Sequence, residues 1–318
     1  MKRLLFIAMM AVIAAPASAQ PKKTPPPPAP PSAADAKSEA DLAYGAYQRG
    51  YYLTALNEAT KRAQQNDPAA MTLLGEIYSQ GLGVPRDDAK AAQWYKLAAD
   101  RGDAHAIFAL AMFRFEGRAG PASPEEGAKL IDQAAKLGNP LAAYDLGLLY
   151  LDGRQFPQDF AHAAQLFKQA AEKGNPEAQY ALATLYKEGR GVPKDAAQAA
   201  RLMEAASVAG NLDAMVEYAI AQFNGTGIAK NESAAAQLFL RAAQRGSAIA
   251  QDRLARILMA GRGMPANPTE AVKWHIIAQA SGASDPDLDI FVNKQTKEVR
   301  DAADAAAKKW LATARPRS

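Results

Sequence analysis

Few residues of this chain have the type and spacing that catalysis or metal binding would need. The three histidines, His105, His162 and His275, are far apart in sequence, and none has a second histidine at a metal-site spacing. Cysteine is absent, which excludes a disulfide framework and a thiolate metal site. The sequence therefore predicts no metal and no cofactor, and we interpret the histidines as surface or interface residues.

Motifs for a nucleophile or a phosphate-binding loop are also missing. The chain contains neither Gly-x-Ser-x-Gly nor Ser-x-x-Lys. The pair Gly81-x-Gly83 follows a predicted helix rather than a strand and lacks the Lys-Ser/Thr of a phosphate loop. Acidic residues are spread along the chain, mostly at helix caps or on exposed faces, so no catalytic pair stands out. We therefore expect no catalytic residues and a protein that is not an enzyme.

Glycine, by contrast, recurs with a strict period of 36 residues. The two series are Gly81, Gly117, Gly153, Gly189, Gly225 and Gly261, and Gly102, Gly138, Gly174, Gly210, Gly246 and Gly282. Because glycine allows the positive φ that follows a helix end, two glycines per period predict two helices per unit, helix A and helix B. A period of this length is typical of a stacked repeat array.

Capping residues mark where each helix begins in six repeats that span residues 67–282. The helix A caps are Asp67, Asp103, Asn139, Asn175, Asn211 and Ser247, and the helix B caps are Asp87, Ser123, Asp159, Asp195, Asn231 and Asn267. Their side chains can accept a hydrogen bond from a free N–H of the first turn. In the first repeat they predict helix A over Pro68–Gln80 and helix B over about Asp88–Arg101. Alanine columns that begin at Ala70 and Ala98 predict close helix packing.

Both ends of the array differ from the repeats, as the ends of a stack require. Residues 39–66 are interpreted as a degenerate capping repeat, with Asn66 in place of the periodic glycine. Residues 283–318 are expected to form one C-terminal capping helix and a basic tail. Its predicted apolar stripe is Leu288, Val292, Gln295, Val299, Ala302 and Ala306, followed by Trp310.

The N-terminal segment predicts export. Residues 1–19 have a basic start, an apolar stretch and a small-residue cleavage site after Ala19, so we expect a signal peptide and a periplasmic protein without a membrane span. An uncleaved anchor is the alternative, but the apolar stretch is short for a bilayer. Residues 20–38 are expected to form a Pro-rich disordered linker, and a role as a spacer is favoured over a role as a recognition site. Cleavage removes Lys2 and Arg3 and lowers the formal net charge from +4 to +2. This small charge does not indicate nucleic-acid binding.

A motif that repeats in register resembles the Sel1-like repeat, a relative of the tetratricopeptide repeat. In the first repeat it reads Leu74-Gly75-x-x-Tyr78-x-x-Gly81-x-Gly83-Val84-Pro85, and helix B continues it with Ala91-x-x-Trp94-Tyr95-x-x-Ala98. The departures from this motif are local. Ala119 and Gln155 replace the second glycine of the turn, Ala229 replaces the turn proline, and Gln222 replaces the tyrosine of helix A. The resemblance implies an all-α fold, a right-handed α/α superhelical solenoid used as an adaptor, often in bacterial envelope signalling or assembly.

One face of helix A is left free by the motif. Positions 69, 73, 76 and 80 point away from Leu74, and their equivalents vary in type along the array. By analogy with related superhelices we expect this face to line a concave groove for a basic or amphipathic peptide segment. The alternative is that its apolar residues pack between adjacent A helices. The predicted partner-binding residues are Met112, Leu148, Ile220 and Thr184, with an acidic margin of Asp145, Asp152, Glu188 and Glu217.

The favoured function is a non-catalytic protein–protein interaction adaptor or scaffold, expected to be a monomer, in envelope signalling or in polysaccharide or cell-wall assembly. A negative regulator that sequesters the periplasmic part of a membrane sensor is an alternative. A hydrolase is another, because some cysteine-rich Sel1-like proteins have been linked to β-lactam binding or cleavage.

A turnover assay separates the adaptor from the hydrolase. We expect the purified mature chain not to hydrolyse a chromogenic β-lactam, because it lacks both cysteine and a serine nucleophile motif. Hydrolysis that is lost when one polar residue is replaced would contradict the adaptor interpretation.

Overall fold

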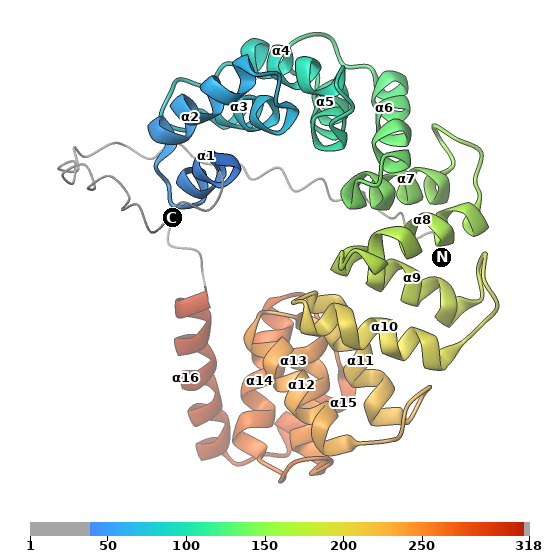
Figure 1. Cartoon of the computed structure of the whole chain (residues 1–318). Helices are drawn as coiled ribbons and strands as arrows, with labels where there is room; N and C mark the ends of the chain where they lie inside the picture. Colours follow the sequence, from blue (N-terminus) through green and yellow to red (C-terminus); the bar gives the residue numbers. More distant parts are fainter. Residues whose placement is uncertain (1–38, 315–318) are drawn as a thin grey trace, which may run out of the picture.

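The computed structural model describes residues 39–314, which form sixteen α-helices and no strand (Figure 1). The expected signal peptide, the linker and the last four residues lie outside the described part of the chain. In chain order the helices are α1 (Glu39–Gln48), α2 (Tyr52–Gln64), α3 (Pro68–Gln80), α4 (Asp88–Ala99), α5 (Ala104–Glu116), α6 (Pro124–Lys136), α7 (Pro140–Asp152), α8 (Phe160–Glu172), α9 (Pro176–Glu188), α10 (Ala196–Val208), α11 (Leu212–Asn224), α12 (Glu232–Gln244), α13 (Ala248–Ala260), α14 (Pro268–Ala280), α15 (Pro286–Asn293) and α16 (Lys297–Ala314).

Consecutive helices pair into hairpins that stack side by side along an open arc (Figure 1). The odd-numbered helices from α3 to α13 are the A helices of the six repeats, and the even-numbered helices from α4 to α14 are the B helices. Helix α3 also contacts α5 directly, and both lie on the inner side of the arc in Figure 1, with α4 and α6 outside them. The prediction of an all-α helical solenoid is confirmed.

The helices from α3 to α14 begin and end where the capping and glycine columns predict. Each N-cap side chain accepts a backbone hydrogen bond; Asp87, for example, accepts one from the Lys90 N–H at 2.9 Å. The glycine after each A helix has φ between 69° and 78°, the left-handed conformation that closes a helix. Asn66 and Ala119 adopt this conformation without being glycine, with φ of 64° and 55°. The geometry is therefore kept at Asn66 and Ala119, whereas Gln155, the other replacement of the second turn glycine, does not have a positive φ.

The core is a continuous seam between neighbouring helices. The alanine column of helix A is at most 2% exposed, and the alanine column of helix B is fully buried. Large side chains such as Leu74, Leu146 and Leu254 pack beside them, each at most 1% exposed. Burial of one such side chain contributes about 1.5–3 kcal/mol. No hairpin could cover these surfaces alone, so each repeat depends on its neighbours.

In two hairpins a glycine of helix A makes room for an aromatic ring of helix B. A Cβ on Gly75 would lie 2.5 Å from the Tyr95 ring, and one on Gly147 would lie 2.5 Å from the Phe167 ring. Phe167 is fully buried against α7, where it also contacts Tyr144 at a ring-centroid distance of 5.7 Å. In the fourth repeat the same two positions hold Ala183 and Met203. In the fourth repeat a larger residue on helix A thus faces a smaller one on helix B, whereas the fifth repeat combines Ala219 with Phe239.

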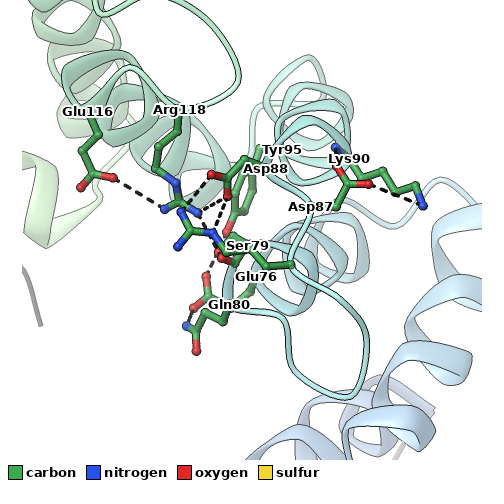
Figure 2. A network of polar contacts seen from close by, with 10 residues as sticks. Glu76, Ser79, Gln80, Asp87, Asp88, Lys90, Tyr95, Glu116 and Arg118 are labelled. Carbon is green, nitrogen blue, oxygen red and sulfur yellow. Dashed lines mark hydrogen bonds and ion pairs between the residues drawn. The ribbon is translucent and has the colours of Figure 1, made fainter. Parts of the chain in front are cut away.

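Arginines in the turns after three of the A helices contact the preceding repeat, Arg118 and Arg262 through ion pairs and Arg190 through the ring of Phe160. Arg118 pairs with Asp88 on the preceding B helix and donates to the Ser79 carbonyl at 3.1 Å (Figure 2). Its guanidinium also lies 4.0 Å from the centroid of the Phe113 ring. Arg262 repeats the arrangement with Glu232. Hydrogen bonds from Arg118, and then from Arg86, hold the pKa of the Asp88 carboxyl well below its usual range.

The C-terminal cap corrects the prediction of a single helix. The chain breaks between α15 and α16, where the Thr296 hydroxyl accepts a hydrogen bond from the Val299 N–H at 3.4 Å. This cap restarts the helix and rotates the buried face, so Ala303 and Ala307 are fully buried instead of Ala302 and Ala306. Helix α16 packs on α14, where Trp310 and Trp274 meet with ring centroids 5.8 Å apart.

We expect Gly147→Ala to lower the free energy of unfolding by about 1–2 kcal/mol, because overpacking against Phe167 outweighs the higher helix propensity of alanine. Urea unfolding followed by circular dichroism measures it. Gly45→Ala is the control, since only the end of the Arg49 side chain approaches that position, and it should raise stability slightly. Adding Phe167→Met, the Ala183–Met203 combination, should recover part of the loss. Equal effects of the two alanine substitutions would contradict the packing argument.

Candidate partner-binding face

The eight predicted binding residues occupy successive A helices. We call the residues at positions 73, 76 and 80 of the first repeat, with their equivalents in the other five, the A-helix face. The members that the sequence predicts as binding residues are Met112 on α5, Asp145, Leu148 and Asp152 on α7, Thr184 and Glu188 on α9, and Glu217 and Ile220 on α11. They follow the array from the second repeat to the fifth rather than gather at one point.

The apolar members of this face are half-buried. Met112 and Leu148 pack against the core of the middle repeats, and Ile220 packs against the core of the C-terminal repeats. Each therefore contributes to helix packing and still has an exposed part that a ligand could contact. The Thr184 hydroxyl donates to the Tyr180 carbonyl at 3.1 Å, so its proton is used within α9.

Three of the four acidic residues predicted to form the margin of the binding site are paired within the chain. Asp152 pairs with Arg154, and Glu188 pairs with Arg190 at 3.3 Å. Glu217 on α11 accepts a hydrogen bond from Lys187 on α9 at 2.7 Å, which links two repeats. The predicted acidic margin is therefore largely neutralised by cations of the same chain.

Asp145 is the acidic member without such a pair. Its half-buried carboxylate makes no hydrogen bond or ion pair with any residue of the described part of the chain. Burial raises the pKa of this carboxyl to about 6, because the charged form loses hydration and gains no cation. Burial, together with the negative charges of Asp145 and Glu177, also raises the pKa of the adjacent Tyr144 to about 12. A cation from a partner would remove the desolvation penalty of Asp145.

A pocket of 340 Å³ opens at the C-terminal end of the face, between α11 and α13. Ile220 is the predicted binding residue that lines it. Arg253 and Arg256 stand in the columns of Asp145 and Leu148, and Arg262 follows in the next turn. Its lining is Ile220, Phe223, Asn224, Phe239, Arg253, Arg256, Ile257, Met259, Ala260 and Arg262.

The sequence reasoning missed the arginines of this pocket. Among the twelve residues that occupy positions 73 and 76 of the six repeats, Arg253 and Arg256 are the two cations. The change of sign in these columns was the signal that could have found them. The charged residues in these two columns therefore change from acidic, at Asp145 and Glu217, to basic at the C-terminal end of the face.

At the N-terminal end, internal contacts occupy the face. The Tyr95 hydroxyl donates to Glu76 at 2.9 Å, and the Gln80 amide donates to the same carboxylate (Figure 2). Glu76 and Gln80 belong to the face in the first repeat, so its polar groups are already used there. The polar groups of the face are therefore available to a partner only beyond the first repeat, from α5 to α13.

The structure places the three histidines in three different settings. His105 is exposed and lies 3.2 Å from the Asn139 amide, while the ring of His162 lies against Tyr150. His275 is buried, and its Nε2 lies 2.7 Å from an Asp289 oxygen. Within residues 39–314 no three His, Asp or Glu side chains gather in a way that could hold a metal ion.

The repeat pattern matches a known family. The Sel1 repeat model matches residues 68–103, 104–139, 140–175, 176–211, 212–247 and 248–279. The chain belongs to the Sel1 repeat family. Sel1 repeats commonly mediate protein–protein interaction, and their fold is typically a non-catalytic scaffold.

Solved structures of Sel1 repeat proteins are similar to this one. A Sel1 repeat protein from Oxalobacter formigenes has 27% identity and a TM-score of 0.64, and the match covers 78% of this chain and 99% of that one. The protective antigen c5321 of uropathogenic Escherichia coli has 24% identity and a TM-score of 0.55 over 86% of this chain and 68% of that one. No curated protein sequence matches the chain. Within the described Sel1 array and its caps, no helix is long and apolar enough to cross a bilayer.

The buried charge of Asp145 predicts a pH-dependent gain on substitution. The folded protein holds this proton more tightly than the unfolded chain, in which the pKa is near 3.8. The loss of folding free energy caused by the ionised Asp145 carboxylate is thus absent below about pH 4. It grows between about pH 4 and pH 6 and is complete above that. Asp145→Asn should therefore raise the free energy of unfolding at about pH 7.5 and change it little at about pH 4.

Urea unfolding at the two pH values measures this gain. Asp152→Asn is the control on the same helix, because it removes a carboxylate that is paired with Arg154. A loss of stability in Asp145→Asn at about pH 7.5 would show that the carboxylate is stabilised internally after all.

Proposed function

We propose that this Sel1 repeat protein is a non-catalytic adaptor of the bacterial periplasm that binds a partner protein through the A-helix face. The family supports the interaction role, because Sel1 repeats commonly mediate protein–protein contacts. The basic, apolar and small-residue pattern of residues 1–19 supports export. The partner would then be an envelope protein that acts in signalling or in polysaccharide or cell-wall assembly.

The unpaired carboxylate of Asp145 is the observation that carries the proposal. A half-buried charge without an internal partner destabilises the free protein, so the folded state alone gives no reason for it. A cation of a bound segment, such as lysine or arginine, would supply the missing partner. Leu148 lies one turn further along α7 and exposes part of an apolar side chain for the same segment.

The middle of the face and its C-terminal end supply different contacts. Helices α7 and α9 present an unpaired carboxylate beside half-buried apolar surface, while α11 and α13 form a pocket with arginines. A segment that lies along these four helices would therefore meet a defined order of charges. Such an order selects a register, because a shifted segment would bring like charges together.

Site-directed photocrosslinking in cells tests this proposal. A photoreactive phenylalanine analogue at Glu188, an exposed member of the face, should form a discrete adduct with a periplasmic protein. The same analogue at Gln165, exposed on helix α8, is the control and should give little of that adduct. Adding Asp145→Arg, which places a cation where the partner's cation is expected, should weaken the Glu188 adduct. Equal adducts from both positions, unaffected by Asp145→Arg, would contradict binding through the A-helix face.

A further inference from the structure

The pocket between α11 and α13 combines an apolar wall with cations. Phe239 and Ile257 are at most 4% exposed and form its inner surface, with Ile220, Phe223 and Met259 nearer the opening. A volume of 340 Å³ falls in the range of ligand pockets and is large for a gap between packed helices. The pocket can therefore receive a large apolar side chain.

Two of the three arginines at the pocket are already neutralised. Arg256 pairs with Asp285 and with Asp287 at 3.4 Å, and Asp252 lies 3.9 Å away. Arg262 pairs with Glu232, and its guanidinium lies 4.4 Å from the centroid of the Phe223 ring. Hydrogen bonds from Arg262, and then from Lys230, lower the pKa of the Glu232 carboxyl to about 2, so this pair persists at neutral pH.

Arg253 is the cation of the pocket that remains available. It is exposed and makes no hydrogen bond or ion pair in the part of the chain that the structure describes. Its positive charge does act on the nearby Asp252 carboxylate. Asp252 is itself beside Arg256 and Asp285. Of the charged groups at the pocket, Arg253 is thus the one that a carboxylate from outside would meet.

The kind of partner segment that fits the pocket follows from the free guanidinium of Arg253, from the apolar wall and from the connection of the pocket to the A-helix face. Ile220 belongs both to the A-helix face and to the pocket wall, so a segment that lies along the face enters the pocket from α11. A segment that continues along the face places its side chains in the pocket, rather than its terminal carboxylate. A guanidinium above an apolar floor fits a Glu or Asp carboxylate next to a large apolar side chain.

We infer that this pocket is the anchor site for an internal acidic–apolar segment of the partner, with the apolar side chain inside and the acidic side chain on Arg253. The inference rests on the proposed adaptor function and deepens it. Because Asp145 has the opposite charge, a segment long enough to reach both sites would be acidic at the pocket and basic near α7. The charge reversal along the face would then fix the direction in which the partner lies.

Fluorescence polarisation with two labelled peptides tests the inference. Both are short and blocked at each end; one has Glu-Leu-Phe-Glu at its centre and the other has Lys-Leu-Phe-Lys. The full mature chain carrying Asp145→Asn, which removes the carboxylate that the basic peptide would meet on α7, should bind the acidic peptide at least about tenfold more tightly than the basic one at low salt. Arg253→Glu should reverse this preference, and Ile220→Asn should weaken binding of the acidic peptide without reversing it.

Arg201→Glu is the matched control, because it makes the same charge change at an exposed position on α10. Thermal unfolding of each variant by circular dichroism identifies any that fails to fold. The inference is overturned if Arg201→Glu acts like Arg253→Glu, or if the chain that carries Asp145→Asn alone does not distinguish the two peptides. Tighter binding of a third peptide that ends in Leu-Phe with a free carboxylate would overturn the assignment to an internal segment. In each case the Glu188 adduct would still report separately on the adaptor function.

Discussion

The rest of the structure depends on the close packing of small residues between neighbouring hairpins. Ala70 and Ala98 begin two columns that are almost completely buried in all six repeats, and these columns let each helix approach the next. Large side chains such as Leu74 then fill the space beside them. Because every hairpin offers the same two surfaces, the array extends until a different element covers the last one. At the C-terminal end this element is α16, which covers α14.

Most of the fold could be predicted from single residues, because the repeat presents each signal six times. Helix α3 has the predicted bounds of Pro68 to Gln80, and α4 ends two residues before the predicted Arg101. The C-terminal cap occurs once, so no column supported its interpretation. An apolar stripe with helical spacing predicted one helix there, but the hydroxyl of Thr296 starts a new helix and moves the buried face to Ala303 and Ala307.

Less of the candidate site could be predicted, for a physical reason. Helical periodicity tells which positions leave the core, and it placed Asp145 and Ile220 on the A-helix face before any contact was known. It cannot tell which charges are cancelled by neighbours, because a pair such as Glu217 with Lys187 joins residues from different repeats. The unpaired state of Asp145 and the pocket beside Arg253 emerge only when side chains are placed in space. The binding properties of the A-helix face thus depend on Asp145 and Arg253, its charged side chains that have neither a hydrogen bond nor an ion pair in the described part of the chain.

The tryptophans of this chain occupy only its two ends. Trp94 lies on α4, and Trp274 meets Trp310 where the C-terminal cap closes the array. The hairpins from α5 to α12 contain none. Indole emission from the intact chain is therefore a built-in optical probe of the terminal repeats and is blind to the middle, where Asp145 lies. Fraying from either end would change the emission spectrum before the central repeats open, so the protein carries its own reporter of the order in which its repeats come apart.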